Sequence, residues 1–327
     1  MIKGNDKLKN IKFIDLFAGI GGFRLAMESF GANCVYSSEW DNDAQNTYEQ
    51  NFGDRPQGDI TKVDEKTIPE HDVVCAGFPC QPFSISGKKL GFEDSRGTLF
   101  FDVARIVKEK KPKVVFMENV KNFETHDNGK TLQVVKATME ELNYDFYYKV
   151  LDASDYGVPQ KRERIYMIAV SKDVPHKDFK FPEPIKSNVH VEDIIDDSVE
   201  LSSKLYKCKY DYQMEKEDTA YSSKPIRLGI VNKGGQGDRI YSTKGIAITL
   251  SAQGGGTFNK TGGYLINGKA RRLSIRECAR LMGFPDDYIP CQREGQAYKQ
   301  FGNSVVVNVL QYIVQEIINC LDVENEN

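Results

Sequence analysis

The chain has 327 residues, of which 40 % are apolar and 28 % charged, with a net charge of −3. This composition is typical of a soluble globular protein with two domains. No apolar run reaches the length of a membrane span and the N-terminus lacks a signal-peptide pattern, so we expect a cytoplasmic protein without a membrane partner. The seven cysteines are scattered and no Cys-x-x-Cys occurs, which favours reduced thiols and no metal site.

The first half of the chain alternates short apolar runs with helical segments. Strands are predicted at 13–17, 34–38, 73–76, 114–117, 146–151 and 165–170, and helices at 23–30, 43–52, 99–110 and 132–142. Strands that alternate with helices indicate an α/β fold with an open, doubly wound, mostly parallel sheet.

That alternation stops near residues 181–184. An acidic, irregular stretch and two glycine-rich segments, 233–237 and 254–257, follow, so we expect a second, smaller domain rich in turns and β-structure. A capping box at Ser274 opens a helix to Leu281, and 304–321 carries an apolar stripe at helical spacing. We therefore predict a first domain of residues 1–190 completed by the C-terminal helix 303–327, and a second domain with its hinge at 191–302.

A glycine turn follows the first predicted strand. Gly19, Gly21 and Gly22 would let the chain approach a ligand at a helix N-terminus, although close packing also explains such a turn. Glu39 ends the second strand, where an acid commonly accepts hydrogen bonds from ribose hydroxyls. Trp40 could stack on an adenine ring and Asp59 could bind its amine. These residues indicate a nucleoside cofactor without separating a dinucleotide from S-adenosylmethionine.

Two chemically capable side chains follow other strands of this sheet. Cys80 lies between two prolines just after the strand at 73–76, and Glu118 ends the strand near 114–117. Because ligands of open α/β sheets bind beyond the carboxyl ends of the strands, both would face one crevice. Taken alone, Cys80 is more typical of a buried structural cysteine than of a nucleophile, and Glu118 is more typical of a cap or surface residue.

Positive charge is concentrated in two places. Arg162 and Arg164 alternate just before the strand at 165–170 and would share one face of an extended chain. Between Tyr221 and Arg272 there are nine Lys or Arg residues and one acid, Asp238. Both features suit a polyanion or a bound base, and both also suit a solvated charged surface.

Six blocks in this order resemble the DNA cytosine-5 methyltransferases, and within that family the HhaI type of modification methyltransferase. They are Phe17–Gly22, Gly77–Gln81, Glu118–Val120, Gln160–Arg164, Arg276–Arg280 and Gly302–Val305. The resemblance implies a Rossmann-like, S-adenosylmethionine-dependent fold with a target-recognition domain, and S-adenosylhomocysteine as product. It implies cofactor-binding roles for Phe17, Gly19, Gly21, Gly22, Glu39, Trp40, Asp59, Ile60, Pro79, Leu99 and Asn303.

The resemblance also implies a covalent mechanism. Cytosine C5 is a poor nucleophile, and addition of the Cys80 thiolate at C6 makes it reactive. Glu118 would protonate N3, Arg164 would contact O2, and Arg162 would orient the site. The base that removes the C5 proton is not identified; a water molecule can serve.

The cytosine must leave the duplex stack, which opens a gap. By resemblance, Ser86 and Gln236 would fill the gap, Arg239 would bind a guanine edge, and Thr249 would contact the backbone. This pattern indicates GCGC as the target in double-stranded DNA. Gln253 stands where the HhaI type has tyrosine, which puts an outer base pair in doubt. The resemblance further implies a monomer, a bacterial host and a restriction endonuclease of the same target.

Other classes explain parts of the pattern. An RNA cytosine methyltransferase could share the fold and the cysteine, but the glycine-rich recognition segment favours duplex DNA. A nicotinamide dehydrogenase leaves Cys80 and Glu118 without a role. A cysteine hydrolase needs a histidine partner, and no histidine lies in any of the six blocks. A non-catalytic DNA-binding protein has no need of the Cys80–Glu118 pair.

Overall fold

The computed structural model describes residues 6–79, 98–185, 187–206, 208, 211–217 and 220–321, without the side chain of Gln236. The chain forms two compact units: a larger one of residues 2–151, 163–183 and 310–327, and a smaller one of residues 152–162 and 184–309. The predicted division differs in placing 152–162, 184–190 and 303–309 in the first domain. In the structure Lys161 N donates to Ala247 O and the Gln160 amide donates to Leu281 O, so the segment 152–162 is joined to the smaller unit.

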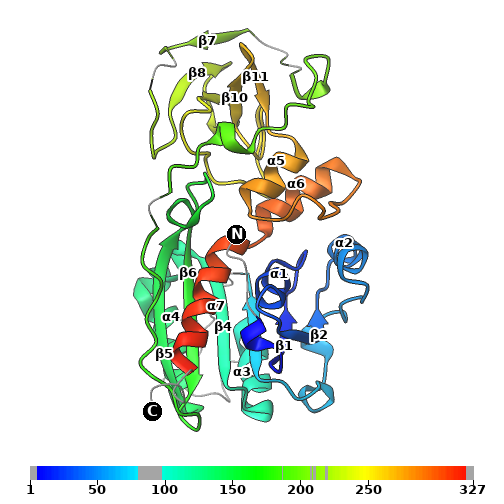
Figure 1. Ribbon diagram of the computed structural model, residues 1–327, viewed down its shortest axis with the longest axis vertical. Coiled ribbons are helices and arrows are strands. Elements are labelled where there is room, and N and C mark those ends of the chain that lie inside the picture. Colours follow the sequence, from blue (N-terminus) through cyan, green and yellow to red (C-terminus); the bar gives the residue numbers. More distant parts are fainter. Residues whose placement is uncertain are drawn as a thin grey trace. The chain divides into compact units, whose positions relative to one another are not determined.

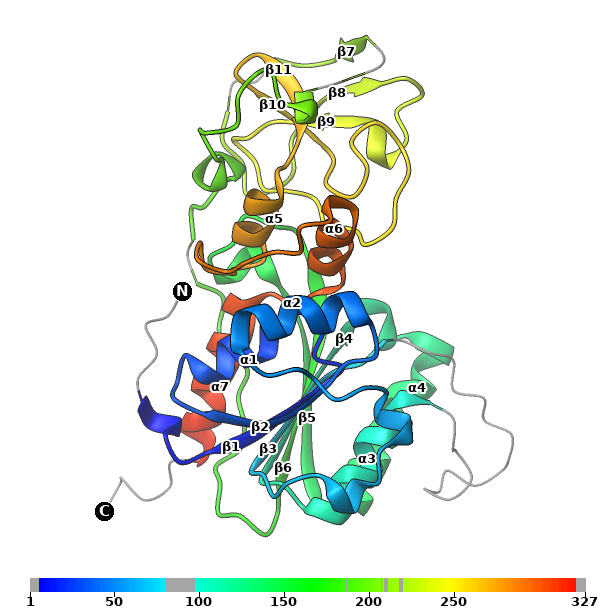
Figure 2. The same cartoon turned by 90° about the vertical axis from the view of Figure 1, so that its right-hand side faces the viewer.

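The larger unit is built on a mixed sheet with the order β2-β1-β3-β4-β6-β5 among the described residues (Figures 1 and 2). Strands β2, β1, β3 and β4 are parallel, and β6 runs antiparallel to β4. The predicted open, mostly parallel sheet is therefore confirmed. The strands are β1 Lys12–Leu16, β2 Asn33–Ser38, β3 Val73–Gly77, β4 Val114–Val120, β5 Tyr144–Asp152 and β6 Glu163–Ser171.

Helices cover both faces of this sheet, with α3 and α4 on one face and α1 and α7 on the other (Figure 2). The main core fills the space between the sheet and α3 and α4, where Ile14, Val74 and Val115 meet Val103 and Val135. On the other face, Gln311 of α7 donates to the Ser29 hydroxyl just after α1. The helices are α1 Gly22–Glu28, α2 Asn42–Phe52, α3 Leu99–Lys110, α4 Lys130–Glu141 and α7 Val307–Leu321.

The smaller unit carries a second sheet, with the order β11-β10-β9-β8-β7 within the described part of the chain. Its small core gathers Val231, Ile240, Phe258 and Ala270, and the predicted β-rich second region is confirmed. The strands are short, and two helices accompany them. The elements are β7 Tyr212–Met214, β8 Arg227–Val231, β9 Arg239–Tyr241, β10 Gly263–Ile266, β11 Lys269–Arg272, α5 Ile275–Leu281 and α6 Glu294–Asn303.

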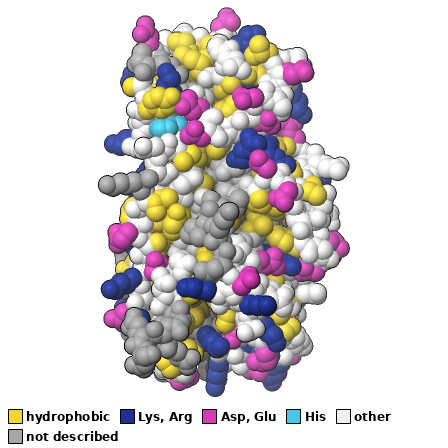
Figure 3. All heavy atoms as spheres, in the orientation of Figure 1, with side chains coloured by type: hydrophobic (Ala, Val, Ile, Leu, Met, Phe, Trp, Pro, Cys, Tyr) yellow, Lys and Arg dark blue, Asp and Glu magenta, His cyan; other side chains and the backbone are white. Residues whose placement is uncertain are grey.

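The C-terminal helix differs from its prediction. It begins at Val307, not Ser304, and the separate helix α6 precedes it. By composition the stretch 294–321 is apolar and long enough to cross a membrane, contrary to the sequence-based expectation, but 67 % of its most apolar window is buried inside the protein. That burial is typical of a core helix. On the face drawn in Figure 3, Lys and Arg side chains stand among acidic ones, in keeping with the small net charge.

Candidate active site

The glycine turn after β1 is held by Glu39. Gly19 N donates to Glu39 Oε2 at 2.8 Å, and Asp41 N donates to Oε1 at 2.8 Å. Gly19 and Gly21 have φ of +55° and +83°, values that L side chains rarely adopt. Burial raises the pKa of the Glu39 carboxyl, although the two amides oppose this effect. The acid at the end of β2 thus fixes the turn at the end of β1.

Trp40 follows Glu39 and is 78 % exposed, which is unusual for so large an apolar side chain. An exposed indole beside an anchored carboxylate suits the stacking of an adenine and the binding of a ribose. The residues around the turn therefore fit a nucleoside cofactor. Among the other predicted cofactor residues, Phe17 and Leu99 are half-buried, Gly22 is buried at the start of α1, and Pro79 is exposed after β3.

Asp59 and Ile60 have local structural roles. Asp59 caps a short 3-10 helix, Ile60–Lys62, and its Oδ1 accepts from Thr61 N at 3.1 Å and from the Thr61 hydroxyl at 2.8 Å. That hydroxyl lowers the pKa of the Asp59 carboxyl, which stays ionised and able to accept further hydrogen bonds. The Ile60 side chain is buried in the main core.

Glu118 and Arg164 form an ion pair at the carboxyl end of β4. Arg164 Nε lies 3.2 Å from Glu118 Oε1, and the two side chains are 17 % and 10 % exposed. Glu118 is in register with Gly77 of β3, two residues before Pro79. The ends of these two strands are therefore adjacent. Cys80 and Ser86 lie outside the described residues.

Asn119 lies in the block Glu118–Val120, and the sequence pattern predicts no role for it. Its side-chain amide donates to Phe78 O at 2.8 Å, and its Oδ1 accepts from Val120 N. This buried contact fixes the backbone of the chain as it leaves β3 toward residue 80. The signal available in the sequence was a polar residue directly after Glu118 at the end of an apolar strand.

Arg162 has a different environment from Arg164. It is 2 % exposed and donates to the carbonyls of Leu250, Gly302 and Ser304 at 3.2, 3.1 and 2.7 Å. All of these contacts lie inside the smaller unit, whereas Arg164 contacts Glu118 in the larger unit. The alternation of the two arginines therefore does not reflect a shared binding face.

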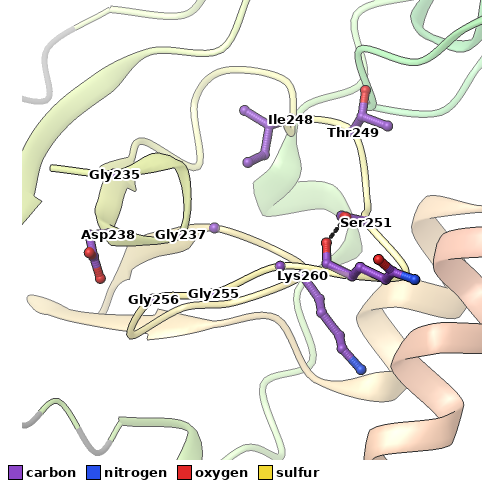
Figure 4. A pocket seen from close by; sticks show the side chains of 12 residues that line it. Gly235, Gly237, Asp238, Ile248, Thr249, Ser251, Gly255, Gly256 and Lys260 are labelled. Carbon is purple, nitrogen blue, oxygen red and sulfur yellow. Dashed lines mark hydrogen bonds between the residues drawn. The ribbon is translucent and has the colours of Figure 1, made fainter.

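Two of the predicted DNA-contacting residues, Thr249 and Gln253, line a cavity of the smaller unit (Figure 4). Its lining includes Ser251 and Lys260, together with Gly235 and Gly237 of one glycine-rich segment and Gly254–Gly256 of the other. Thr249 donates its hydroxyl to Lys161 O, and Arg239 Nε donates to Gly234 O at 3.4 Å. The backbone of Gln236 lies in this region, and Asn303 is exposed at the end of α6.

The basic segment from Tyr221 to Arg272 is predicted to bind a polyanion, but part of its positive charge is neutralised within the protein. Three of the nine basic residues form ion pairs: Arg227 with Glu215, Arg271 with Glu277, and Arg272 with Glu294. The Arg271–Glu277 pair is fully buried, so it serves the fold. The basic residues left for a ligand include Arg239, which follows the cavity-lining residue Asp238 in the chain.

A glycine turn, an acid after the second strand and an ion pair near the end of the fourth are arranged on this sheet as in a methyltransferase fold of the S-adenosylmethionine-dependent class, the class to which the comparisons assign it. The fold resembles that of S. pombe Dnmt2 methyltransferase, with a TM-score of 0.70 and 17 % identity over 94 % of this chain and 98 % of that one. It also resembles that of the Entamoeba histolytica methyltransferase EhMeth, with a TM-score of 0.70 and 20 % identity over 94 % of this chain and 98 % of that one.

Residues 11–319 match the model of the C-5 cytosine-specific DNA methylase family, and the chain belongs to that family. It is a DNA cytosine-5 methyltransferase. Among curated proteins it is 63 % identical to the type II methyltransferase M.HhaI of Haemophilus parahaemolyticus, over 98 % of this chain and 99 % of that protein. It is 45 % identical to the type II methyltransferase M.SsoII of Shigella sonnei, over 97 % and 83 %.

Proposed function

We propose that this enzyme is the modification methyltransferase of a restriction-modification system, which flips a cytosine out of double-stranded DNA and methylates C5 through a covalent Cys80–C6 adduct. The observation that carries the proposal is the Glu118–Arg164 pair beside the end of β3, the strand that leads to Cys80. The names of its curated relatives support the biological setting.

The cofactor in this proposal is S-adenosylmethionine, which supplies the methyl group when bound. Glu39 would accept the ribose hydroxyls, Trp40 would stack on the adenine, and the turn at Gly19–Gly22 would let the backbone approach closely. Phe17, Asp59, Ile60, Pro79, Leu99 and Asn303 complete the proposed set. The proposed reaction uses no metal.

Catalysis would begin when the Cys80 thiolate adds to C6 of the flipped cytosine. The electrons move toward N3, which Glu118 protonates, and C5 becomes an enamine-like nucleophile. C5 then accepts the methyl group, which leaves S-adenosylhomocysteine. A water molecule can take the C5 proton as Cys80 is expelled, and Glu118 takes back the proton from N3. Arg164 is placed beside Glu118, where its guanidinium can both orient that carboxyl and donate to O2 of the ring.

The smaller unit would provide target recognition. Arg239 would donate to a guanine in the major groove, Thr249 would contact the backbone, and Gln236 with Ser86 would fill the gap left by the flipped base. We propose GCGC as the target, with Gln253 affecting an outer base pair. The enzyme would act as a cytoplasmic monomer. Its cognate restriction endonuclease would recognise the same DNA target but would not bind to the methyltransferase.

The test is methyl transfer from labelled S-adenosylmethionine to duplexes with GCGC or with one outer pair changed, with Cys80→Ser as the control. Transfer that requires both GCGC and Cys80 would support reaction, nucleophile and target together. Transfer to duplexes with a changed outer pair would keep the proposed reaction and show that the target predicted from the loop around Gln253 is wrong. Absence of transfer to every duplex, with cofactor still bound, would contradict the proposal.

A trap experiment separates the covalent mechanism from other chemistries. DNA containing 5-fluorocytosine cannot lose a proton from C5, so the enzyme should remain attached to it. An adduct with the parent enzyme, and none with Cys80→Ser, is expected. A parent enzyme that methylates DNA but forms no adduct would overturn the covalent step alone.

A further inference from the structure

The two glycine-rich loops of the smaller unit cross in very close contact. A Cβ atom on Gly237 would lie 1.9 Å from Gly255 O, and one on Gly256 would lie 2.7 Å from the Gly237 carbonyl carbon. Phe258 N donates to Gly237 O at 2.7 Å. Each loop thus supports the other through its backbone, and both line the cavity of Figure 4.

Asp238 provides the side-chain link across this crossing. Its Oδ1 accepts from Thr257 N at 2.8 Å, and its own N–H donates to Gly235 O at 2.8 Å. The Asp238 carboxylate also packs closely against Gly256, because a Cβ atom on Gly256 would lie 3.0 Å from Asp238 Oδ1. A single acid therefore sets the position of the 254–257 loop relative to the 234–237 loop.

We propose that Asp238 is a positioning residue for target discrimination: by binding Thr257 N–H it holds the two glycine-rich loops in the register needed to read the target. This inference rests on the proposed function. Asp238 is the only acid in the basic segment 221–272, and its neighbour Arg239 is the proposed base-reading residue. Loops made of glycine have no side chains to hold them, so a small displacement would change which base edges their backbone can reach.

The proposal requires an acceptor oxygen at this position and not a negative charge. Asp238→Asn keeps a carbonyl oxygen that can accept from Thr257 N, whereas Asp238→Ala removes it. In an alternative role, the Asp238 carboxylate would accept a hydrogen bond directly from a cytosine amino group. Asp238→Ala would then also lose discrimination. The exchange of the Thr257 amide in DNA-free enzyme distinguishes these two roles, because an asparagine oxygen could accept a hydrogen bond in either of them.

The experiment compares kcat/KM for GCGC with kcat/KM for duplexes that have one outer pair changed. For Asp238→Ala we expect the ratio to fall about tenfold to a hundredfold, mainly through a higher KM for GCGC, with cofactor affinity unchanged. Asp238→Asn should stay close to the parent. Asp287→Ala, which removes an exposed carboxylate of the same unit, is the control and should leave the ratio unchanged.

Amide hydrogen exchange of residues 254–262 without DNA gives a readout independent of activity. Exchange should be faster in Asp238→Ala and unchanged in Asp238→Asn. An unchanged ratio or unchanged exchange in Asp238→Ala would overturn the proposal, as would an asparagine variant as defective as the alanine variant. If the parent methylates no DNA, the proposed function fails, and the exchange result still decides whether Asp238 holds the loops.

Discussion

Arg164 Nε lies 3.2 Å from Glu118 Oε1, and this contact joins the end of β4 to the start of β6. The two strands are antiparallel neighbours, so their pairing brings together side chains that are 46 positions apart in the chain. Both side chains are largely buried, which strengthens their interaction relative to a surface ion pair. A carboxyl held in this way is oriented before substrate binds.

Glu118→Gln should reduce the rate of methyl transfer by about 10²- to 10⁴-fold, the usual contribution of general acid catalysis. Glutamine keeps the size of the side chain but cannot transfer a proton to N3, and it loses the ion pair with Arg164. Single-turnover methyl transfer measures the effect. Cofactor affinity should be unchanged, and a variant with the parent's rate would exclude Glu118 as the proton donor.

Arg162→Met should act mainly on stability. The carbonyls of Leu250, Gly302 and Ser304 would lose their charged donor, and at roughly 1 kcal/mol or more for each buried group the free energy of unfolding should fall by about 3 kcal/mol. Urea denaturation measures the loss.

Arg164→Met is the matched comparison for Arg162→Met, because it removes a guanidinium from the same block. It should cost less stability than Arg162→Met and more methyl-transfer activity, since Arg164 lies beside Glu118. The reverse order would show that Arg162 serves the reaction and Arg164 the fold.

The larger unit could be predicted from sequence because its strands are nearly continuous apolar runs. Val73–Gly77 and Val114–Val120 are buried over almost their whole length, a pattern that identifies strands of a parallel sheet. The turn at Gly19 and the acid at Glu39 could be predicted for the same reason, because strand ends locate ligand sites in such sheets.

The smaller unit could not be predicted in the same detail. Its strands are three to five residues long, so their pairing with neighbours decides their structure more than local pattern does. Helix α6 contains Gly295 and Gly302 near its ends, which weakens its local signal. The break between α6 and α7 follows from Arg162, whose guanidinium binds the carbonyls of Gly302 and Ser304.

Cofactor binding should weaken as the pH falls, because ribose hydroxyls need an ionised Glu39 to accept their hydrogen bonds. Burial raises the pKa of this carboxyl above its ordinary value of 4.5, so protonation begins at a higher pH than for an exposed glutamate. Above the raised pKa the affinity should be constant, and below it the affinity should fall. Calorimetric titration with S-adenosylhomocysteine measures this.

Glu39→Gln is the control for the pH dependence of binding. Glutamine does not titrate, so this variant should bind more weakly at neutral pH and show a nearly constant affinity as the pH falls. A decline in Glu39→Gln as steep as that of the parent would assign the pH dependence to another group.

Gly21→Ala should impair cofactor binding because the turn leaves no space for a Cβ atom, which would lie 2.2 Å from the Phe52 ring. Gly53→Ala is its matched control: the two glycines have φ of +83° and +81°, but a Cβ on Gly53 would meet nothing within 4 Å. Both variants incur about 1–2 kcal/mol of backbone strain, and only Gly21→Ala must also displace an aromatic ring. Thermal unfolding and S-adenosylhomocysteine titration of both should show a further loss of stability and a weaker affinity in Gly21→Ala alone. Equal affinities in the two variants would show that the ring moves aside freely and that the turn does not depend on close packing.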